Sequence, residues 1–283
     1  MAAQPEWLRQ VPERVGGLRL PEGARVLFTG CGTSYHAALA SGRAAQALEI
    51  LLGNAPEADL LVAISHEGGT RLTLEAVEAF AGETWLITGP KEESALARAV
   101  DHVVVATPEI EKSYCHTASY TCAVAAGRAL QGEDVGGLAD AVAAELDAEP
   151  LGASQHERFA IVGSGRDLPT VLEAALKLRE GARVAAEPHH TEQVLHGHLA
   201  AIDPGVRCIL LEGEGRAAQR AHDVLRALGE LGCEATMVHT SHPVVDIVRF
   251  QRLACDLADA RGVNPDLIRW DEEPWDRARK AYD

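Results

Sequence analysis

Residues 25–34, with the sequence RVLFTGCGTS, decide the fold of this chain. Val26, Leu27 and Phe28 form a short apolar run that ends at Gly30, a pattern typical of a buried strand. A small polar turn follows, and the Ala-rich segment after it is expected to be a helix that continues to about residue 52. A strand, a polar turn and a helix in this order predict the first unit of a parallel α/β sheet.

The same pattern recurs along the chain. Residues 158–166, RFAIVGSGR, repeat the strand and its Gly-x-Gly turn, which suggests an internal duplication. Other apolar runs predict strands at 59–64, 84–88, 101–105, 206–211 and 235–239, and amphipathic segments predict helices at 5–20, 113–131, 138–147 and 217–231. Residues 149–152, EPLG, are the expected linker.

The expected fold is therefore α/β, with two doubly wound parallel-sheet subdomains of three αβα layers each. Residues 1–150 would form the first domain with its N-terminal helix, and residues 151–283 the second domain with a C-terminal tail. Ligands of such sheets bind at the carboxyl ends of the strands, where the Gly-x-Gly turns lie.

Composition narrows the class of protein. The net charge of −16 and the absence of a basic block argue against nucleic acid or an anionic membrane surface as a partner. We find no apolar run of the roughly 20 residues that span a membrane, and no secretory signal at the start. The six Cys show no CxxC pair, which is typical of reduced thiols in a cytoplasmic protein.

Residues 172–201, LEAALKLREGARVAAEPHHTEQVLHGHLAA, combine acids, an amine and imidazoles. Glu173, Lys177 and Glu180 are spaced by four and three residues, so a helix places them on one face, where an acid and an amine can exchange protons with a ligand. The plain alternative is a solvated Glu–Lys pair, which this stretch alone slightly favours.

The second half of this stretch is rich in His, at positions 189, 190, 196 and 198. With a preceding carboxylate, mobile imidazoles would make a plausible acid/base set. A metal site is poorly supported, because His189 and His190 are adjacent and no Cys or acid completes a closed ligand set. We therefore expect no metal.

The turns after the first two strands suit an anionic ligand. Residues 30–34, GCGTS, and residues 65–70, SHEGGT, offer backbone amides and hydroxyls at the starts of helices. The alternative for the first turn is that Thr33 or Ser34 simply caps the helix. The turn lacks the GxGxxG pattern and no acid is placed for a ribose, so no dinucleotide cofactor is expected.

Four motifs, VLFTGCGTSYHAA, LLVAISHEGGTRLTLEA, FAIVGSGRDLPTVLEAALKLREGARVAAE and VLHGHLAAID, together resemble the sugar isomerase (SIS) domain family. In particular, residues 22–266 are similar to the tandem SIS pair that forms the isomerase half of glucosamine-6-phosphate synthase. The glutaminase half of that enzyme has no counterpart in these residues. The resemblance implies a small-molecule sugar or sugar phosphate as the ligand, with no cofactor.

Position by position, the resemblance also implies roles for individual residues. The hydroxyls of Ser34, Ser65 and Thr70 would hold a sugar phosphate, and Glu180 would move a proton between the first two sugar carbons. His196 would open the sugar ring from a neighbouring subunit, which implies a homodimer, and Lys177 would belong to the same site. The other expected substrate-binding residues are Cys31, Gly32, Thr33, His66, Glu67 and His116.

The sequence departs from the family at three places. Glu67 stands where the second loop of the family has a Ser, and a carboxylate repels a phosphate dianion. Glu67 would therefore meet a hydroxyl, an amine, or a phosphate shifted toward Thr33, Ser34 and Thr70, unless it turns to solvent or pairs with Arg71. Tyr114-Cys115-His116 matches the Ser-Thr-Lys loop only loosely, and the tail lysine has no counterpart except the nearby Lys280. The tail acids 271–273 are interpreted as a solvated patch.

The predicted function is that of a sugar-metabolising enzyme, either an aldose–ketose isomerase or an amino-sugar isomerase or deaminase. The alternatives are a deglycase that cleaves a sugar–amine adduct and a non-catalytic sugar-binding module. The presence of Glu180, Lys177 and His196 together favours the enzyme, because a protein that only binds sugar needs no proton shuttle.

Overall fold

The computed structural model describes residues 1–282 and divides the chain into two compact units. The first unit comprises residues 1–111 and 116–147, and the second comprises residues 112–115 and 148–282. The short segment Lys112–Cys115 thus packs with the second unit although it lies within the sequence of the first. No helix within the described residues is long and apolar enough to cross a membrane.

The first unit contains a five-stranded parallel sheet with the order β2-β1-β3-β4-β5. Every residue of β3 is buried, as expected for a parallel sheet covered on both faces. The chain leaves β1 toward β2 on one side and returns to β3 on the other, so the turns after β1 and β3 meet at the switch point of the sheet. The strands are β1 (Val26–Gly30), β2 (Ala44–Gln46), β3 (Leu60–Ile64), β4 (Glu83–Thr88) and β5 (His102–Val105).

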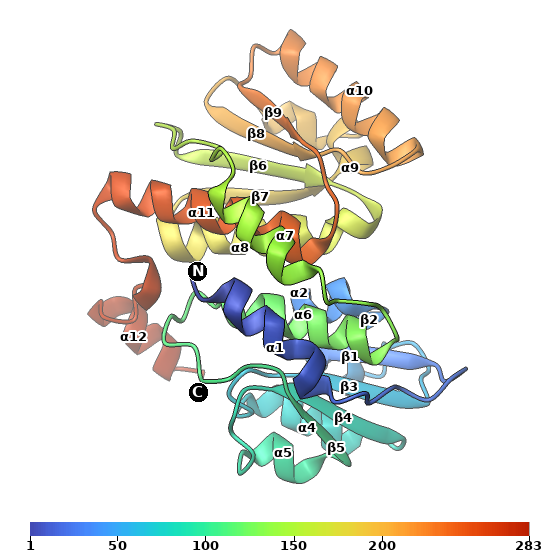
Figure 1. The fold of residues 1–283 in the computed structure, drawn as a ribbon. Coiled ribbons are helices and arrows are strands. Elements are labelled where there is room, and N and C mark those ends of the chain that lie inside the picture. The colour runs from blue at the N-terminus through green and yellow to red at the C-terminus, as the bar shows by residue number, and fades with distance from the viewer. Residues whose placement is uncertain (283) are drawn as a thin grey trace. The chain divides into compact units, whose positions relative to one another are not determined.

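Two groups of helices cover this sheet (Figure 1). Members of the first group are α1 (Gln4–Val15), α2 (Thr33–Ser41), α6 (Ala118–Leu130) and α7 (Leu138–Asp147), and members of the second are α3 (Ala47–Leu51), α4 (Arg71–Ala79) and α5 (Ala95–Ala99). Leu27, Leu61 and Leu86 from three adjacent strands form a core with Val77 of α4 and Leu96 of α5. This core fixes α4 and, with it, the loop that leads into it from β3.

The second unit contains a four-stranded parallel sheet with the order β7-β6-β8-β9. Its helices α8 and α11 pack together on one face, and α9 and α10 pack on the other (Figure 1). The elements are β6 (Arg158–Gly163), η1 (Gly165–Asp167), α8 (Leu168–Ala182), β7 (Ala185–His190), α9 (Thr191–Leu195), η2 (His198–Ala201), β8 (Val206–Leu211), α10 (Arg216–Glu230), β9 (Ala235–Val238), α11 (Pro243–Arg261), η3 (Pro265–Leu267) and α12 (Glu273–Lys280).

The predicted fold class is confirmed, because each unit is a parallel sheet with helices on both faces. The first four strands of the first sheet and the four strands of the second have the same spatial order, β2-β1-β3-β4 and β7-β6-β8-β9. A duplication would produce this correspondence, and the duplication itself stays a prediction.

Three predicted helices have different limits in the structure. The Ala-rich helix does not continue to residue 52, because it ends at Ser41 and residues 44–46 form the edge strand β2. The first helix ends at Val15, where Gly16 adopts a left-handed conformation with φ of 60°. Helix α6 begins at Ala118 rather than at residue 113, because a carboxylate satisfies its first amides there.

The His-rich stretch is also more ordered than predicted. Ala185–His190 pairs with β6 as the strand β7, so His189 and His190 belong to a sheet and are not on a mobile loop. Pro188 is tolerated because β7 is the edge strand of this sheet.

Candidate functional site

The turn after β1 brings the start of α2 close to the end of the strand. A Cβ atom on Gly30 would lie 2.7 Å from the carbonyl carbon of Ser34, so only glycine fits here. Gly32, with φ of 56°, takes the N-cap position, and Thr33 is the first residue of α2. Neither Thr33 nor Ser34 is therefore the cap residue, contrary to the plain alternative. Cys31 Sγ lies 3.6 Å from Thr73 Oγ1 of α4.

The loop after β3 brings two of the predicted hydroxyls together. Ser65 Oγ lies 3.2 Å from Thr70 Oγ1, and Ser65 is buried. Gly68 has φ of 65° and a Cβ atom there would lie 2.1 Å from Ser94 Oγ, so the loop depends on glycine at this point. Since β1 and β3 are neighbours, the two turns occupy the same edge of the first sheet.

Glu67 makes an ion pair that was not predicted. Its carboxylate accepts a hydrogen bond from Lys91 Nζ at 2.5 Å, across a sequence separation of 24 residues. Arg71, the predicted partner, pairs with Glu75 instead. The hydrogen bond from Lys91 holds the pKa of Glu67 below its ordinary value. The negative charge that distinguishes this loop from the family it resembles is therefore matched by a cation that follows β4.

His66, from the same loop, faces the protein rather than solvent. Its Nε2 accepts a hydrogen bond from the backbone amide of Glu111 at 2.8 Å, and its carbonyl accepts one from the amide of Gly89 at 2.9 Å. Burial, with a further contribution from His116, lowers the pKa of His66 to about 4, so the ring is neutral at pH 7. These two hydrogen bonds of His66 hold the loop in place. A contact of His66 with substrate stays a prediction.

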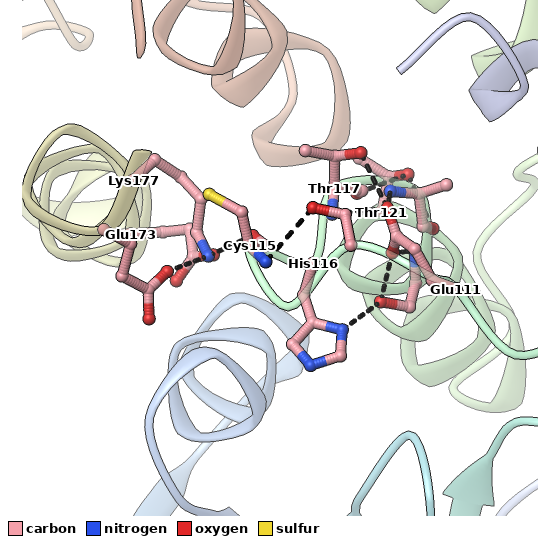
Figure 2. A network of polar contacts seen from close by, with 11 residues as sticks. Glu111, Cys115, His116, Thr117, Thr121, Glu173 and Lys177 are labelled. Atoms are coloured by element: carbon pink, nitrogen blue, oxygen red, sulfur yellow. Dashed lines mark hydrogen bonds and ion pairs between the residues drawn. The ribbon is translucent and has the colours of Figure 1, made fainter. Parts of the chain in front are cut away.

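His116 lies next to His66, with the two ring centroids 5.5 Å apart in an edge-to-face arrangement. Its Nδ1 is 3.2 Å from Ser119 Oγ, and the hydroxyl of Ser119 also contacts Glu111 at 2.6 Å (Figure 2). The predicted residues Ser65, His66 and Thr70 and the more distant His116 therefore gather around one loop of the first unit.

Helix α8 of the second unit carries the acid and amine predicted from their spacing. Lys177 Nζ lies 3.3 Å from Glu173, and it also donates to the carbonyl of Cys115 (Figure 2). The same Nζ lies 2.7 Å from Glu180. Glu173 and Lys177 have side chains that are 0% exposed, whereas that of Glu180 is 23% exposed. The alternative of a solvated pair is therefore wrong.

Burial by itself would lower the pKa of Lys177, but Glu173 and Glu180 outweigh it and raise the pKa above its ordinary value. The ammonium form of Lys177 is thus favoured, and its contact with Glu180 orients that carboxylate. Glu180 is the partly exposed member of the three, which suits a group that must reach a ligand.

His196 is held by a carboxylate that the sequence analysis did not single out. Its Nε2 lies 2.9 Å from Glu192 Oε1, and Arg220 binds both oxygens of Glu192, through Nε at 2.8 Å and Nη2 at 3.1 Å. The hydrogen bond from Arg220 lowers the pKa of Glu192, so the carboxylate is ionised and can only accept. Nε2 of His196 therefore carries a proton. The side chain of His196 is 68% exposed.

The C-terminal tail is packed against its own unit. The ring centroids of Trp270 and Tyr114 are 4.2 Å apart. The guanidinium carbon of Arg269 lies 3.2 Å from the ring centroid of Trp275. Glu272 pairs with Arg183 and Arg269, so the tail acids are not simply a solvated patch. Lys280 pairs with Asp276 at 2.6 Å. Among the residues that the structure describes, no group of His, Cys, Asp and Glu could hold a metal ion.

Comparisons with known proteins agree with this architecture. The chain is 27% identical over 87% of its length to glutamine–fructose-6-phosphate aminotransferase (isomerizing) of Methanothermobacter thermautotrophicus, of which the match covers 50%. Two solved structures share the fold over 93–94% of this chain and 93% of their own. They are glucosamine-6-phosphate deaminase from Thermotoga maritima (TM-score 0.76, 22% identity) and tagatose-6-phosphate ketose/aldose isomerase from Escherichia coli (TM-score 0.75, 18% identity).

The chain has the tandem sugar-isomerase (SIS) fold. The predicted resemblance to one half of the synthase is confirmed, and the chain spans about half the length of the curated relatives it matches. No protein-family model matches the chain. In this SIS chain, the spacing of residues along α8 and the two turns revealed most of the candidate residues. The sequence analysis missed Lys91, Glu111, Ser119, Glu192 and Arg220. Lys91 and Arg220 pair with residues 24 and 28 positions away, which leaves no local signal. Ser119 and Glu192 contact His116 and His196 three and four positions away, a spacing that could have revealed them.

Proposed function

We propose that this SIS chain is an enzyme that interconverts the aldose and ketose forms of a sugar phosphate or amino sugar, with or without release of the amine. The observation that carries the proposal is the buried Glu173–Lys177 pair that holds Glu180 at the surface of α8. Burying two charges is costly, and a protein that only binds sugar has no need for a carboxylate oriented in this way.

The roles of the individual residues are those that the sequence resemblance implies. The hydroxyls of Ser34, Ser65 and Thr70 and the starts of α2 and α4 bind the anionic or hydroxyl end of the substrate. Glu180 moves the proton between neighbouring carbons, and His196 gives and takes the proton that opens the ring. The names of the similar proteins, an aminotransferase, a deaminase and a ketose/aldose isomerase, support this chemistry.

A thermal-shift screen of sugars, their phosphate esters and amino sugars, followed by an isomerase assay on each ligand found, tests the proposal. A substrate raises the melting temperature by mass action, and conversion of the bound ligand is the expected result. A ligand that binds tightly but is recovered unchanged, with no ammonia or amine released, would instead favour the sugar-binding module.

The pairing of Glu67 with Lys91 removes the reason for excluding a phosphate from the first unit. Replacing Lys91 by Met should therefore leave Glu67 unpaired and weaken binding of a sugar phosphate about tenfold, which corresponds to about 1.4 kcal/mol and allows for screening at an exposed site. Affinity for the unphosphorylated sugar should be unchanged. Calorimetric titration of both ligands measures the difference.

The double variant Lys91→Met, Glu67→Ser is the matched control, because it removes both charges and should restore most of the affinity for the ester. Equal weakening of both ligands by the single variant would show that Lys91 supports the loop without setting its charge. Unchanged binding of the ester by Lys91→Met would show that Lys91 does not neutralise Glu67.

We further infer that the chain acts as a homodimer in which His196 of one copy serves the substrate bound to the other. The high exposure of His196 in its own chain supports this arrangement. Mixing two inactive variants, Glu180→Gln and His196→Asn, under conditions that exchange subunits should then restore activity. Random pairing makes half of the dimers mixed, each with one intact site of two, so about a quarter of the wild-type activity is expected.

Each variant refolded alone serves as the control, and the dimer content is measured by light scattering. If Glu180 and His196 of the same chain act together, no mixture regains activity. That outcome, or a monomer in solution, would contradict the shared site.

A further inference from the structure

The carboxylate of Glu111 occupies the N-terminus of α6 (Figure 2). Oε1 accepts hydrogen bonds from the amide of Thr117 at 2.9 Å, the hydroxyl of Thr117 at 2.8 Å and the amide of Ala118 at 3.1 Å. Oε2 accepts from the amide of Ser119 at 2.8 Å and the hydroxyl of Ser119 at 2.6 Å. Burial alone would raise the pKa of Glu111, but these hydrogen bonds outweigh it and lower the pKa. Glu111 is therefore ionised at neutral pH.

An ionised carboxylate can only accept hydrogen bonds, so each group bonded to it must donate a proton to it. The single hydroxyl proton of Ser119 is donated to Glu111 at 2.6 Å. Ser119 Oγ can then only accept from His116 Nδ1, which lies 3.2 Å away. In its neutral form, the ring of His116 thus carries its proton on Nδ1 and its lone pair on Nε2.

The backbone of His116 is constrained as well. Its φ of 43° lies in the left-handed region, which residues other than glycine adopt only where the surroundings impose it. The three residues that follow His116 are the ones that Glu111 binds, so the same carboxylate fixes both the backbone and the ring.

Titratable groups of the loop after β3 act on His116. His66 is neutral at pH 7 and faces the ring of His116 edge to face. Glu67 also acts on His116, but Lys91 pairs with it. His66 belongs to the loop that holds Ser65 and Thr70. Its ring contact with His116 therefore places the ring of His116 beside this loop.

We propose that His116 is a proton acceptor for a hydroxyl group of the substrate, and that Ser119 and Glu111 are positioning residues that hold its ring in the reactive tautomer. The proposal rests on the proposed function and adds a second acid/base group to it. A substrate O–H bond breaks, and its proton forms an N–H bond at Nε2 of His116. The imidazolium is then stabilised by Glu111 through Ser119, and it returns the proton to the neighbouring oxygen of the sugar, so the ring ends neutral.

The tautomer can be measured without any substrate. In the full-length chain labelled with ¹⁵N-histidine, the shifts of the two ring nitrogens show which one carries the proton, and His116→Gln assigns the signal among the 12 His. At a pH where the ring is neutral, the expected result is a proton on Nδ1 alone, and a mixture of tautomers in Ser119→Ala. Ser154→Ala is the matched control, because Ser154 Oγ contacts His156 Nδ1 at 3.0 Å with no part in the proposal. It should change only the signal of His156.

Kinetics test the role in the reaction. His116→Gln should lower kcat by at least about 100-fold, the typical loss on removing an acid/base group. Ser119→Ala should lower kcat about 10- to 100-fold, the usual effect of removing the partner that orients a histidine, with little change in KM. Ser154→Ala should match the wild type.

A proton on Nε2 of His116 in the wild type would overturn the proposal, and so would near-full turnover by His116→Gln. The melting temperature of Ser119→Ala shows whether this variant folds. If it does not fold, the result for His116→Gln alone tests the proposal. If the wild type converts no sugar, the proposed function fails, whereas the ¹⁵N spectrum still decides whether Glu111 and Ser119 set the tautomer.

Discussion

Replacing Glu180 by Gln should lower kcat about 100- to 10,000-fold, because the amide keeps the shape of the side chain but cannot take the carbon-bound proton. Lys177 Nζ, 2.7 Å from Glu180, remains able to donate to the amide oxygen, so the variant should fold and bind substrate with a similar KM. Exchange of the substrate C–H proton with deuterated solvent measures the same step directly and should be lost together with turnover.

Glu230→Gln is a matched control for this experiment, since Glu230 is an exposed carboxylate at the end of α10. It should retain the activity of the wild type. Near-full turnover by Glu180→Gln on a substrate that the wild type converts would exclude Glu180 as the base. A neighbouring acid would then have to take the proton.

Replacing Lys177 by Met should reduce the free energy of unfolding by about 3–5 kcal/mol, because it leaves the charge of Glu173 buried without a partner. Glu173 and Lys177 are both fully buried, so water cannot compensate for the lost ammonium group. For a chain of this size the melting temperature should fall by on the order of 10 °C. Differential scanning calorimetry measures the change, and the transition of the second unit is the one expected to move.

The double variant Lys177→Met, Glu173→Gln tests the cause, because it removes the unpaired charge together with its partner. It should regain a large part of the stability that the single variant loses, since a neutral amide costs far less to bury than a carboxylate. A single variant as stable as the wild type would show that Glu173 is protonated or reaches water, and the account of α8 given above would then be wrong.

Local patterns predicted much of the candidate site. The turns at Gly30–Gly32 and Gly68 were recognisable because a backbone that closes tightly needs glycine, whatever the rest of the fold does. The helical spacing of Glu173, Lys177 and Glu180 predicted that they meet. The same spacing occurs in exposed ion pairs, so it contained no information on whether the pair is buried.

The remaining partners depend on the order of the strands. Lys91 follows β4 and Glu67 follows β3. The two residues are 24 positions apart in the sequence, and they meet because these strands are neighbours in the sheet. Glu111 reaches the start of α6 and the ring of His66, and Glu192 of α9 reaches Arg220 of α10. The Lys91–Glu67 and Glu192–Arg220 pairs join segments that are separate in sequence, where side chains of the right charge are too numerous for one partner to stand out.

The sequence by itself determined the alternation of strands and helices, the two glycine-bearing turns and the face of α8, because these depend on periodicity and on backbone conformation over a few residues. Only the tertiary structure decided that Lys112–Cys115 packs with the second unit, that His189 and His190 lie on an edge strand, and that Glu173 and Lys177 are buried. Burial and ion pairing depend on which surfaces cover a residue, and those surfaces come from distant parts of the chain.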